Sequence, residues 1–263
     1  MLSKKEPVPY FANLNFNNFK LENWIETNNQ KALIDGEIQL NGSNLLNIKS
    51  EVSILANLEN SHFNNVVFDT LTVDGTYYND NLSAVLNVSS DYGDVEITGN
   101  LKNISNTPSY DAFIKSSNFN LTAFVPEMMG TTVNGIIEAE GMGFDLKEVL
   151  AKAKITLSKS SVYEFPIDSL YANVNLSKQN VSIDSMQLAV PGASAHGSGY
   201  LSLDSLILKS IIYAQLTSAN FIDSLVVLPI QFDSATTVAN ISGPINELEI
   251  EGDAEIFSAL AYT

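Results

Sequence analysis

The side chains best suited to chemistry in this sequence are two histidines and a glycine-rich stretch. His62 and His196 stand in no metal-binding spacing such as His-Glu-x-x-His, and they occupy non-equivalent positions in an internal repeat. We therefore expect both to be surface or turn residues. The stretch from Gly192 to Gly199 lacks the lysine of a phosphate-binding loop and the helical pattern that would follow one. Its small residues indicate a tight bend or a close backbone approach instead.

Carboxylates, thiols and glycosylation triplets add no candidate site. The acidic residues are dispersed, without a calcium loop or a shared pair of carboxylates, and there is no cysteine to form a disulfide or ligate a metal. Asn-x-Ser/Thr triplets begin at Asn87, Asn120 and Asn175, but polar-apolar-polar alternation on a strand produces this pattern by itself. We predict that the chain is not an enzyme and has no catalytic residue, no metal site and no cofactor.

Composition narrows the classes of partner. The chain of 263 residues has 13 basic and 30 acidic side chains and a net charge of −17, which argues against nucleic acid and against a polybasic grip on anionic lipid. Hydrophobic residues make up 45%, whereas charged residues make up only 16%, below the ~25% that is usual in soluble domains. No apolar run reaches the ~18–20 residues that span a bilayer, and residues 1–9 do not resemble a signal peptide. We expect any signal or anchor to lie outside this chain.

The elements expected from the pattern are short antiparallel strands. Apolar and polar residues alternate over stretches such as 52–58, 82–88 and 170–176, and turn signals such as Asp74-Gly75 and Gly243-Pro244 separate them closely. Parallel strands would need long crossover connections, so we predict an all-β antiparallel fold. At most one or two short helices are expected. Residues 144–152 suit a short helix or a single turn leading into a strand, and residues 126–130 suit another turn.

The chain repeats itself weakly about once every hundred residues. One copy starts at Asp35-Gly36-Glu37-Ile38 and the next at Asn134-Gly135-Ile136-Ile137, an offset of 99 that keeps the phase of the alternation. The predicted organisation is the end of a preceding repeat (1–34), copy one (35–133), copy two (134–235) and the start of a truncated third copy (236–263). Such a repeat predicts a stacked β architecture that belongs to a longer protein.

Period-2 alternation gathers the apolar side chains on one face of the sheet, and something must bury that face. A second sheet could pack on it, the sheet could close into a barrel, or it could curl into a trough with an apolar inner face. In the trough, lipid acyl chains would be the partner. The pattern alone leaves these arrangements open. The candidate lining residues of the trough are Val52, Ile54, Leu71, Val73, Leu82, Leu86, Ile155, Leu157, Leu170, Val174, Leu176, Val181, Ile183, Leu201 and Leu203.

Four segments of copy two carry a family resemblance. They are Gly-Ile-Ile-Glu-Ala-Glu-Gly (135–141), Leu-Tyr-Ala-Asn-Val-Asn-Leu (170–176), Val-Ser-Ile-Asp-Ser-Met-Gln-Leu (181–188) and Ala-Ser-Ala-His-Gly-Ser-Gly-Tyr-Leu (193–201). Together they resemble the repeated β domain of the TamB-like translocation and assembly proteins, in the wider AsmA-like group. Residues 35–126 and 236–257 match as weaker copies. The shared features are residue types rather than invariant motifs.

This resemblance implies an elongated, curled, U-shaped antiparallel sheet with an apolar groove. Proteins of this group are anchored in the inner membrane of double-membraned bacteria by an N-terminal helix, cross the periplasm, support outer-membrane assembly and are viewed as bridges for phospholipid. The chain lacks that helix and a C-terminal segment that would meet the outer-membrane assembly machinery. It would then be an internal segment whose membrane anchor and assembly partners lie outside it, and whose own partner is the acyl chains of phospholipid. The family brings no catalytic residues.

Two competing functions share parts of the pattern. A structural or adhesive cell-surface β-repeat protein would have the same alternation and acidity, but its apolar face would be closed by a second sheet and would bind no lipid. A carbohydrate-active enzyme would need paired carboxylates and aromatic platforms, whereas the sequence has a single tryptophan and dispersed tyrosines. The state of the apolar face therefore separates the lipid-binding hypothesis from the structural one.

Overall fold

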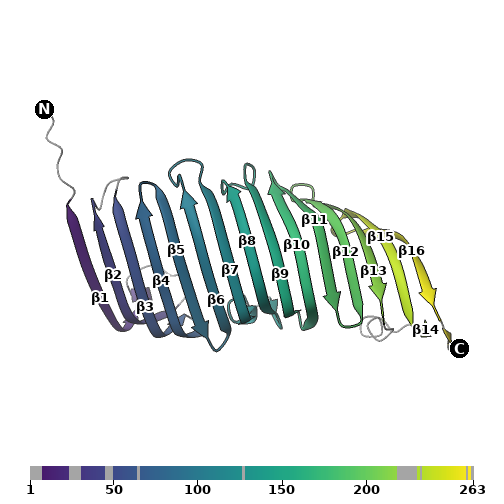
Figure 1. The fold of residues 1–263 in the computed structure, drawn as a ribbon, viewed down its shortest axis with the longest axis horizontal. Coiled ribbons are helices and arrows are strands. Elements are labelled where there is room, and N and C mark those ends of the chain that lie inside the picture. Colours follow the sequence, from purple (N-terminus) through teal and green to yellow (C-terminus); the bar gives the residue numbers. More distant parts are fainter. Residues whose placement is uncertain are drawn as a thin grey trace. The chain divides into compact units, whose positions relative to one another are not determined.

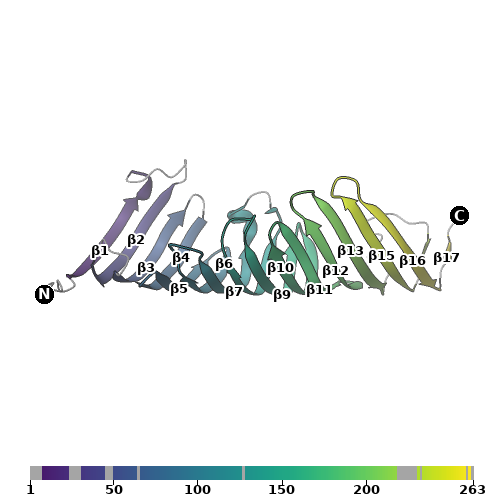
Figure 2. The ribbon, with the colours of Figure 1, turned by 90° about the horizontal axis from the view of Figure 1, so that it is seen from above.

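The computed structural model consists almost wholly of β-strands arranged in two compact units, residues 1–132 (unit 1) and 133–263 (unit 2). Each unit is an antiparallel sheet whose strands lie beside one another in chain order, as Figures 1 and 2 show. The structure describes residues 8–23, 31–44, 50–63, 66–125, 128–217, 230–231, 233–258 and 260–261.

In its described residues unit 1 contains seven strands, each paired with its neighbour in the sequence. They are β1 (Pro9–Lys20), β2 (Ala32–Ser43), β3 (Glu51–Phe63), β4 (Val66–Tyr78), β5 (Asn81–Ser90), β6 (Gly93–Lys102) and β7 (Ser109–Asn120). Two 3-10 turns, η1 (Leu21–Asn23) and η2 (Leu121–Ala123), follow β1 and β7.

Unit 2 follows the same plan, and the part of it that the structure describes has eight strands in its main sheet. They are β8 (Thr132–Met142), β9 (Leu150–Val162), β10 (Phe165–Ser177), β11 (Asn180–Val190), β12 (Ala193–Ser202), β13 (Ile207–Leu216), β15 (Ser234–Pro244) and β16 (Glu249–Phe257). Two short strands, β14 (Ile230–Gln231) and β17 (Leu260–Ala261), pair with each other.

The prediction of an all-β, curled antiparallel fold is confirmed. The hairpin connections are as short as the turn signals indicated, since two residues join β4 to β5 and β10 to β11. Residues 144–148 form turns, and β9 begins at Leu150, so the segment 144–152 is the turn leading into a strand rather than a helix. In the other expected turn, residues 126 and 127 lie outside the described residues, and residues 128–130 form a turn.

The strand frame repeats with the offset that the sequence indicated. β9 and β10 begin and end 99 residues after β3 and β4, respectively. Asn60, Lys159 and Ser258 also lie 99 residues apart, and each has a positive φ, between 47° and 54°. A side chain with a β-carbon rarely adopts this conformation, and a residue that does so within a strand interrupts the ladder and bends the strand. The same local bend is thus built three times from three different residue types.

A buried serine follows this bend in both units. Ser61 Oγ accepts a hydrogen bond from the backbone N–H of Asp35 (3.1 Å) and donates to its carbonyl oxygen (3.2 Å). Ser160 Oγ makes the same two bonds with Asn134, at 2.9 and 3.1 Å. Both serines are only 5% exposed. The register of β2 and β3 shifts between Leu33 and Gly36. The side chain of Ser61 thus replaces the ladder hydrogen bonds that are missing there.

Candidate functional site

The six lining residues predicted in unit 1 lie on one face of its sheet. Residues directly opposite in an antiparallel pair share a face. Ile54 is opposite Gly75, and Leu71 and Val73 of β4 are opposite Val88 and Leu86 of β5. Val52 and Leu82 join the same face through Tyr77, which is opposite both of them.

Unit 2 places eight of its nine predicted residues on one face. The pairs that carry this face run from Leu157 and Ile155 in β9 to Leu170 and Ala172 in β10, and from Val174 and Leu176 to Ile183 and Val181 in β11. Val181 is in turn opposite Leu201 in β12. Leu203 is the exception, because β12 ends at Ser202 and Leu203 lies in the turn that follows.

The apolar face extends over more residues than were predicted, because the strand pairing places residues of further strands on the same face. In unit 2 the alternation slips by one residue between Ile183 and Met186, where a register shift moves the apolar positions from odd to even numbers. Among the described residues, none of those paired on this face carries a charge. The added large apolar members are Leu14, Ile38, Leu40, Leu58, Val88, Val95, Ile97, Leu101 and Ile114 in unit 1, and Met186, Leu188, Val190, Leu208, Ile212, Leu216, Ile241, Ile250 and Ile256 in unit 2.

The apolar face is only partly shielded. None of the fifteen predicted lining residues is buried; Ile54 and Leu82 are 36% and 38% exposed, and the others are intermediate. The inner faces of two packed sheets interdigitate and exclude water, so large residues at their centre would be buried. Within the described part of the chain, no second sheet packs on this face.

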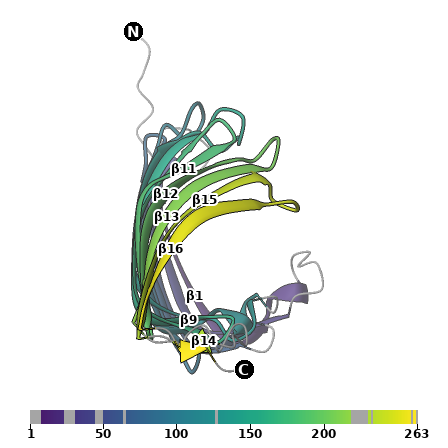
Figure 3. The same cartoon turned by 90° about the vertical axis from the view of Figure 1, so that its right-hand side faces the viewer.

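Curvature explains the partial shielding in unit 2. Along β12 the residues of the apolar rows, such as Ala195 and Gly197, are intermediate in exposure, whereas their neighbours His196 and Ser198 are exposed. Figure 3 shows that the strands of unit 2 bow around one side of their sheet. Side chains on the inner side of a curved sheet converge and shield one another. We infer that the apolar rows occupy this inner, concave side.

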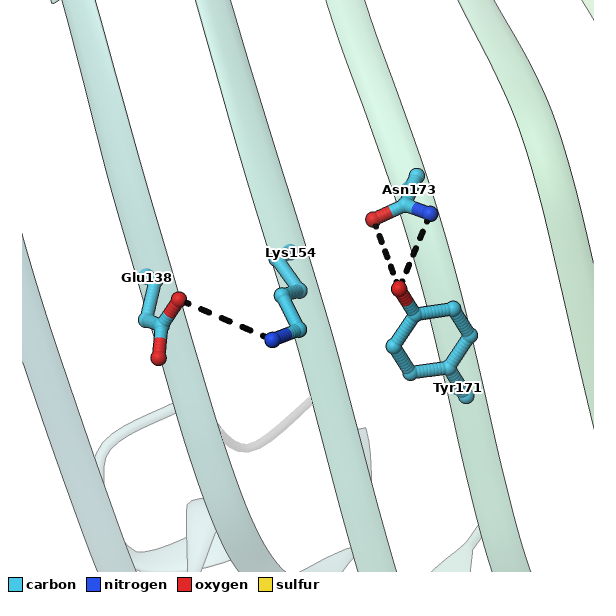
Figure 4. Close-up of polar contacts among 4 residues, drawn as sticks. All are labelled: Glu138, Lys154, Tyr171 and Asn173. Atoms are coloured by element: carbon cyan, nitrogen blue, oxygen red, sulfur yellow. Dashed lines mark hydrogen bonds and ion pairs between the residues drawn. The ribbon is translucent and has the colours of Figure 1, made fainter.

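The opposite face is mostly polar and carries side-chain hydrogen bonds. Asn173 Nδ2 donates to the hydroxyls of Tyr171 (3.0 Å) and Ser185 (3.0 Å), and Lys154 Nζ lies 3.9 Å from a carboxylate oxygen of Glu138 (Figure 4). The ion pair is exposed, so it contributes little to stability. Such a wet outer face is the expected complement of an uncharged inner one.

Three aromatic rings form a cluster in unit 1. Phe124, in the segment after η2, stacks on Phe119 of β7 with ring centroids 5.0 Å apart and lies 6.2 Å from the ring of Phe68 in β4. The segment is itself fixed, because Thr122 Oγ1 accepts from the backbone N–H of Gly130 and donates to the carbonyl of Met128. Sequence reasoning missed this cluster, since its members lie far apart in the chain.

A shallow hollow of about 150 Å³ interrupts the apolar face of unit 2. Its lining residues include Gly197 and Gly199, together with Val181, Met186 and Leu208. A β-carbon on Gly197 would lie 2.4 Å from the carbonyl oxygen of Ile211, so backbone packing rather than a ligand requires the glycine. The glycine-rich stretch is therefore part of strand β12, in agreement with the expected close backbone approach.

Both histidines lie on strands, with exposed side chains. His196 of β12 stacks on Tyr213 of β13, with ring centroids 5.0 Å apart, on the polar face. His62 lies in β3 opposite Val67. The described residues contain no group of three or more His, Cys, Asp or Glu side chains placed to hold a metal ion. They also include no helix whose length and apolarity would allow it to cross a bilayer.

No family model, no curated protein and no solved structure matches this chain. The resemblance to the TamB-like proteins therefore rests on the sequence pattern alone. The uncharged, partly exposed face of each unit is the feature from which a function has to be argued.

Proposed function

We propose that this chain is a lipid-binding segment whose apolar face solvates acyl chains without catalysing a reaction. The observation that carries this proposal is that uncharged residues continue across consecutive strands of each unit while most of their large side chains stay partly exposed. Exposed apolar surface of this extent marks a site of interaction in soluble proteins. An acyl chain is the simplest partner that demands no polar contact.

The energetics suit passive transfer. Each methylene buried against the face contributes about 0.8 kcal/mol, so a two-chain phospholipid can be held without any specific polar contact. Because neighbouring strands offer the same kind of apolar surface, a lipid can move from one strand to the next without losing a unique set of contacts. Its head group would stay in water at the open side, since the rows contain no charged residue to receive it.

The structural or adhesive alternative needs a covered face. It is disfavoured by the exposure of residues such as Ile54 and Leu82 and by the absence of a packed second sheet in the described part of the chain.

We further propose the setting implied by the TamB-like resemblance. In that setting the chain is a segment of an inner-membrane-anchored protein of the bacterial cell envelope, carries phospholipid across the periplasm and supports outer-membrane assembly.

The test is native mass spectrometry with lipid extraction on the chain purified from cells in mild detergent. We expect phospholipid to co-purify and to be lost, about tenfold or more, in Val174→Asp and Ile183→Asp, because a buried carboxylate opposes acyl chains. The matched control is Thr156→Asp, which adds the same charge to the exposed face of neighbouring β9. Circular dichroism checks that each variant is folded. A folded wild type without lipid, or folded variants that keep it, would refute the proposal.

A further inference from the structure

Tyrosines recur at one end of the strands on the apolar face of unit 1. Tyr10, Tyr77 and Tyr110 are each the second residue from an end of their strand, in β1, β4 and β7. The strand register places them in a single row across the sheet, which we call the tyrosine row. The residues that connect them in this row are Gly42, Val52, Leu82 and Leu101. Successive tyrosines are three strands apart, about 14 Å at the usual strand spacing.

The hydroxyl of Tyr10 is buried on this face without a partner. Tyr10 is opposite Gly42, and a β-carbon on Gly42 would lie within 2.6 Å of both Oη and Cζ of Tyr10. The phenol therefore extends across β2 on the side of the sheet where Val52 also lies. No described residue makes a hydrogen bond with Tyr10 Oη, although this oxygen is shielded from water. A buried hydroxyl without a partner costs free energy, so it points to a further group that completes it.

Tyrosine suits the boundary between an apolar surface and water. Its ring packs against hydrocarbon while its hydroxyl makes hydrogen bonds, which is why tyrosine is enriched where proteins meet the interface of a bilayer. In a phospholipid the ester carbonyls lie at the corresponding level, between the acyl chains and the head group. They accept hydrogen bonds and carry no charge, as an uncharged row of hydroxyl donors requires.

Unit 2 has a different composition at the equivalent positions. Leu176 lies 99 residues after Tyr77, and Leu208 corresponds to Tyr110 because each is opposite a leucine of the preceding strand. The equivalent row of unit 2 is made of Leu176, Val181, Leu201 and Leu208, none of which has a hydroxyl. The strands thus form with leucine at these positions, so the pairing of the strands does not require the tyrosines.

We propose that Tyr10 and Tyr77 donate hydrogen bonds to the ester carbonyl oxygens of a phospholipid bound on the apolar face of unit 1. This inference rests on the proposed lipid binding and adds an orientation to it. The esters lie at the tyrosine row, the acyl chains extend from there along the face, and the head group lies in water beyond the strand ends. Unit 2 holds acyl chains without such an ester contact.

The experiment compares two probes by isothermal titration calorimetry on the chain freed of lipid by detergent exchange. Dihexanoyl phosphatidylcholine has ester carbonyls, whereas its dihexyl ether analogue has the same head group and chain length but no carbonyl. We expect the wild type to bind the diester about three- to tenfold more tightly than the diether, as one or two hydrogen bonds would provide. The double variant Tyr10→Phe with Tyr77→Phe, which keeps both rings, should lose this preference.

The matched control is Tyr78→Phe with Tyr213→Phe. It also removes two phenol hydroxyls, but these side chains are 60% and 40% exposed and lie on the polar face, so the preference should remain. An equal affinity of the wild type for the two probes, or a preference that survives in the tyrosine-row variant, would overturn this inference and leave the lipid-binding proposal intact. Binding of neither probe would overturn both.

Unfolding of the lipid-free chain provides a second readout. Tyr10→Phe should leave the denaturant midpoint unchanged or raise it, because the variant removes an unpaired buried hydroxyl and keeps the ring. A hydroxyl with a structural role would instead be paired within the protein, and its removal would lower the midpoint. A lowered midpoint would therefore contradict the assignment of Tyr10 to the lipid, whatever the chain binds.

Discussion

Unit 1 and unit 2 have strands at equivalent positions but differ in the size of the side chains on their apolar faces. The pair Gly75 and Ala84 in unit 1 lies where unit 2 has Val174 and Ile183, and both pairs are directly opposite in register. A β-carbon on Gly75 would meet only ordinary contacts, the nearest being Ile54 Cγ2 at 3.6 Å, so no backbone constraint requires this glycine. The positions of the strands are therefore set by turns and bends, whereas the size of the side chains on the apolar face differs between the two copies.

The largest expected effect tests whether both units depend on a close backbone approach at a glycine. Gly36 and its counterpart Gly135 each leave room for a carbonyl oxygen, of Asn57 and Thr156, that would lie 2.2 Å from an added β-carbon. Gly36→Ala and Gly135→Ala should each destabilise their unit by about 2–3 kcal/mol through overpacking. Gly36→Ala should cost about 1 kcal/mol more, because Gly36 also has a φ of 133°.

Hydrogen exchange with mass spectrometry, which follows each unit separately, gives the two values. Gly75→Ala is the matched control, since its β-carbon meets no contact under 3.6 Å, and it should change stability by less than about 0.5 kcal/mol. Equal, small effects at Gly36 and Gly135 would show that the units do not depend on the same close approach.

The buried serines test whether the bend is held in the same way in both units. Ser61→Ala and Ser160→Ala should each cost about 0.5–1.5 kcal/mol, because each removes the hydrogen bonds between a buried hydroxyl and the backbone of Asp35 or Asn134. The two costs should agree, and in the double variant they should add. Denaturant unfolding measures them, with the exposed Ser198→Ala as the control. A cost confined to one unit would mean that the other bend is held by different contacts.

The smallest effect concerns a carboxylate that unit 2 lacks, since the counterpart of Glu37 is Ile136. Gln39 Nε2 donates to Glu37 Oε1 at 2.9 Å and Asn13 Nδ2 donates to it at 2.6 Å, and these bonds lower the pKa of Glu37 below its usual value. The folded state therefore gains a small stabilisation above the unfolded pKa, and this gain is lost as the pH falls through the lower folded pKa.

Carbon-13 NMR titration should give Glu37 a midpoint below the usual value of a glutamate side chain, and Gln39→Leu should raise it. An unchanged midpoint in that variant would contradict the assigned cause. Because Glu37 is only partly shielded from water, we expect no measurable change in the overall unfolding transition.

Much of this fold could be predicted because its signals are local. Alternation at stretches such as 52–58 and 170–176 placed fourteen of fifteen predicted residues on the apolar face, since successive side chains on a strand point to opposite sides. The prediction went wrong at Leu203, where the apolar phase continues into a turn. It also stopped short of Met186 and Leu188, because a register shift moves the phase by one residue.

The sequence by itself determined the strand type, the repeat and the uncharged composition of one face, because these follow from period, spacing and residue type. Only the tertiary structure decided that no second sheet covers the apolar face in the described part of the chain. It also decided that the rings of Phe68 and Phe119 both lie against the ring of Phe124 in unit 1. These features depend on contacts between distant segments, and alternation carries no information about what lies beyond the strand that shows it.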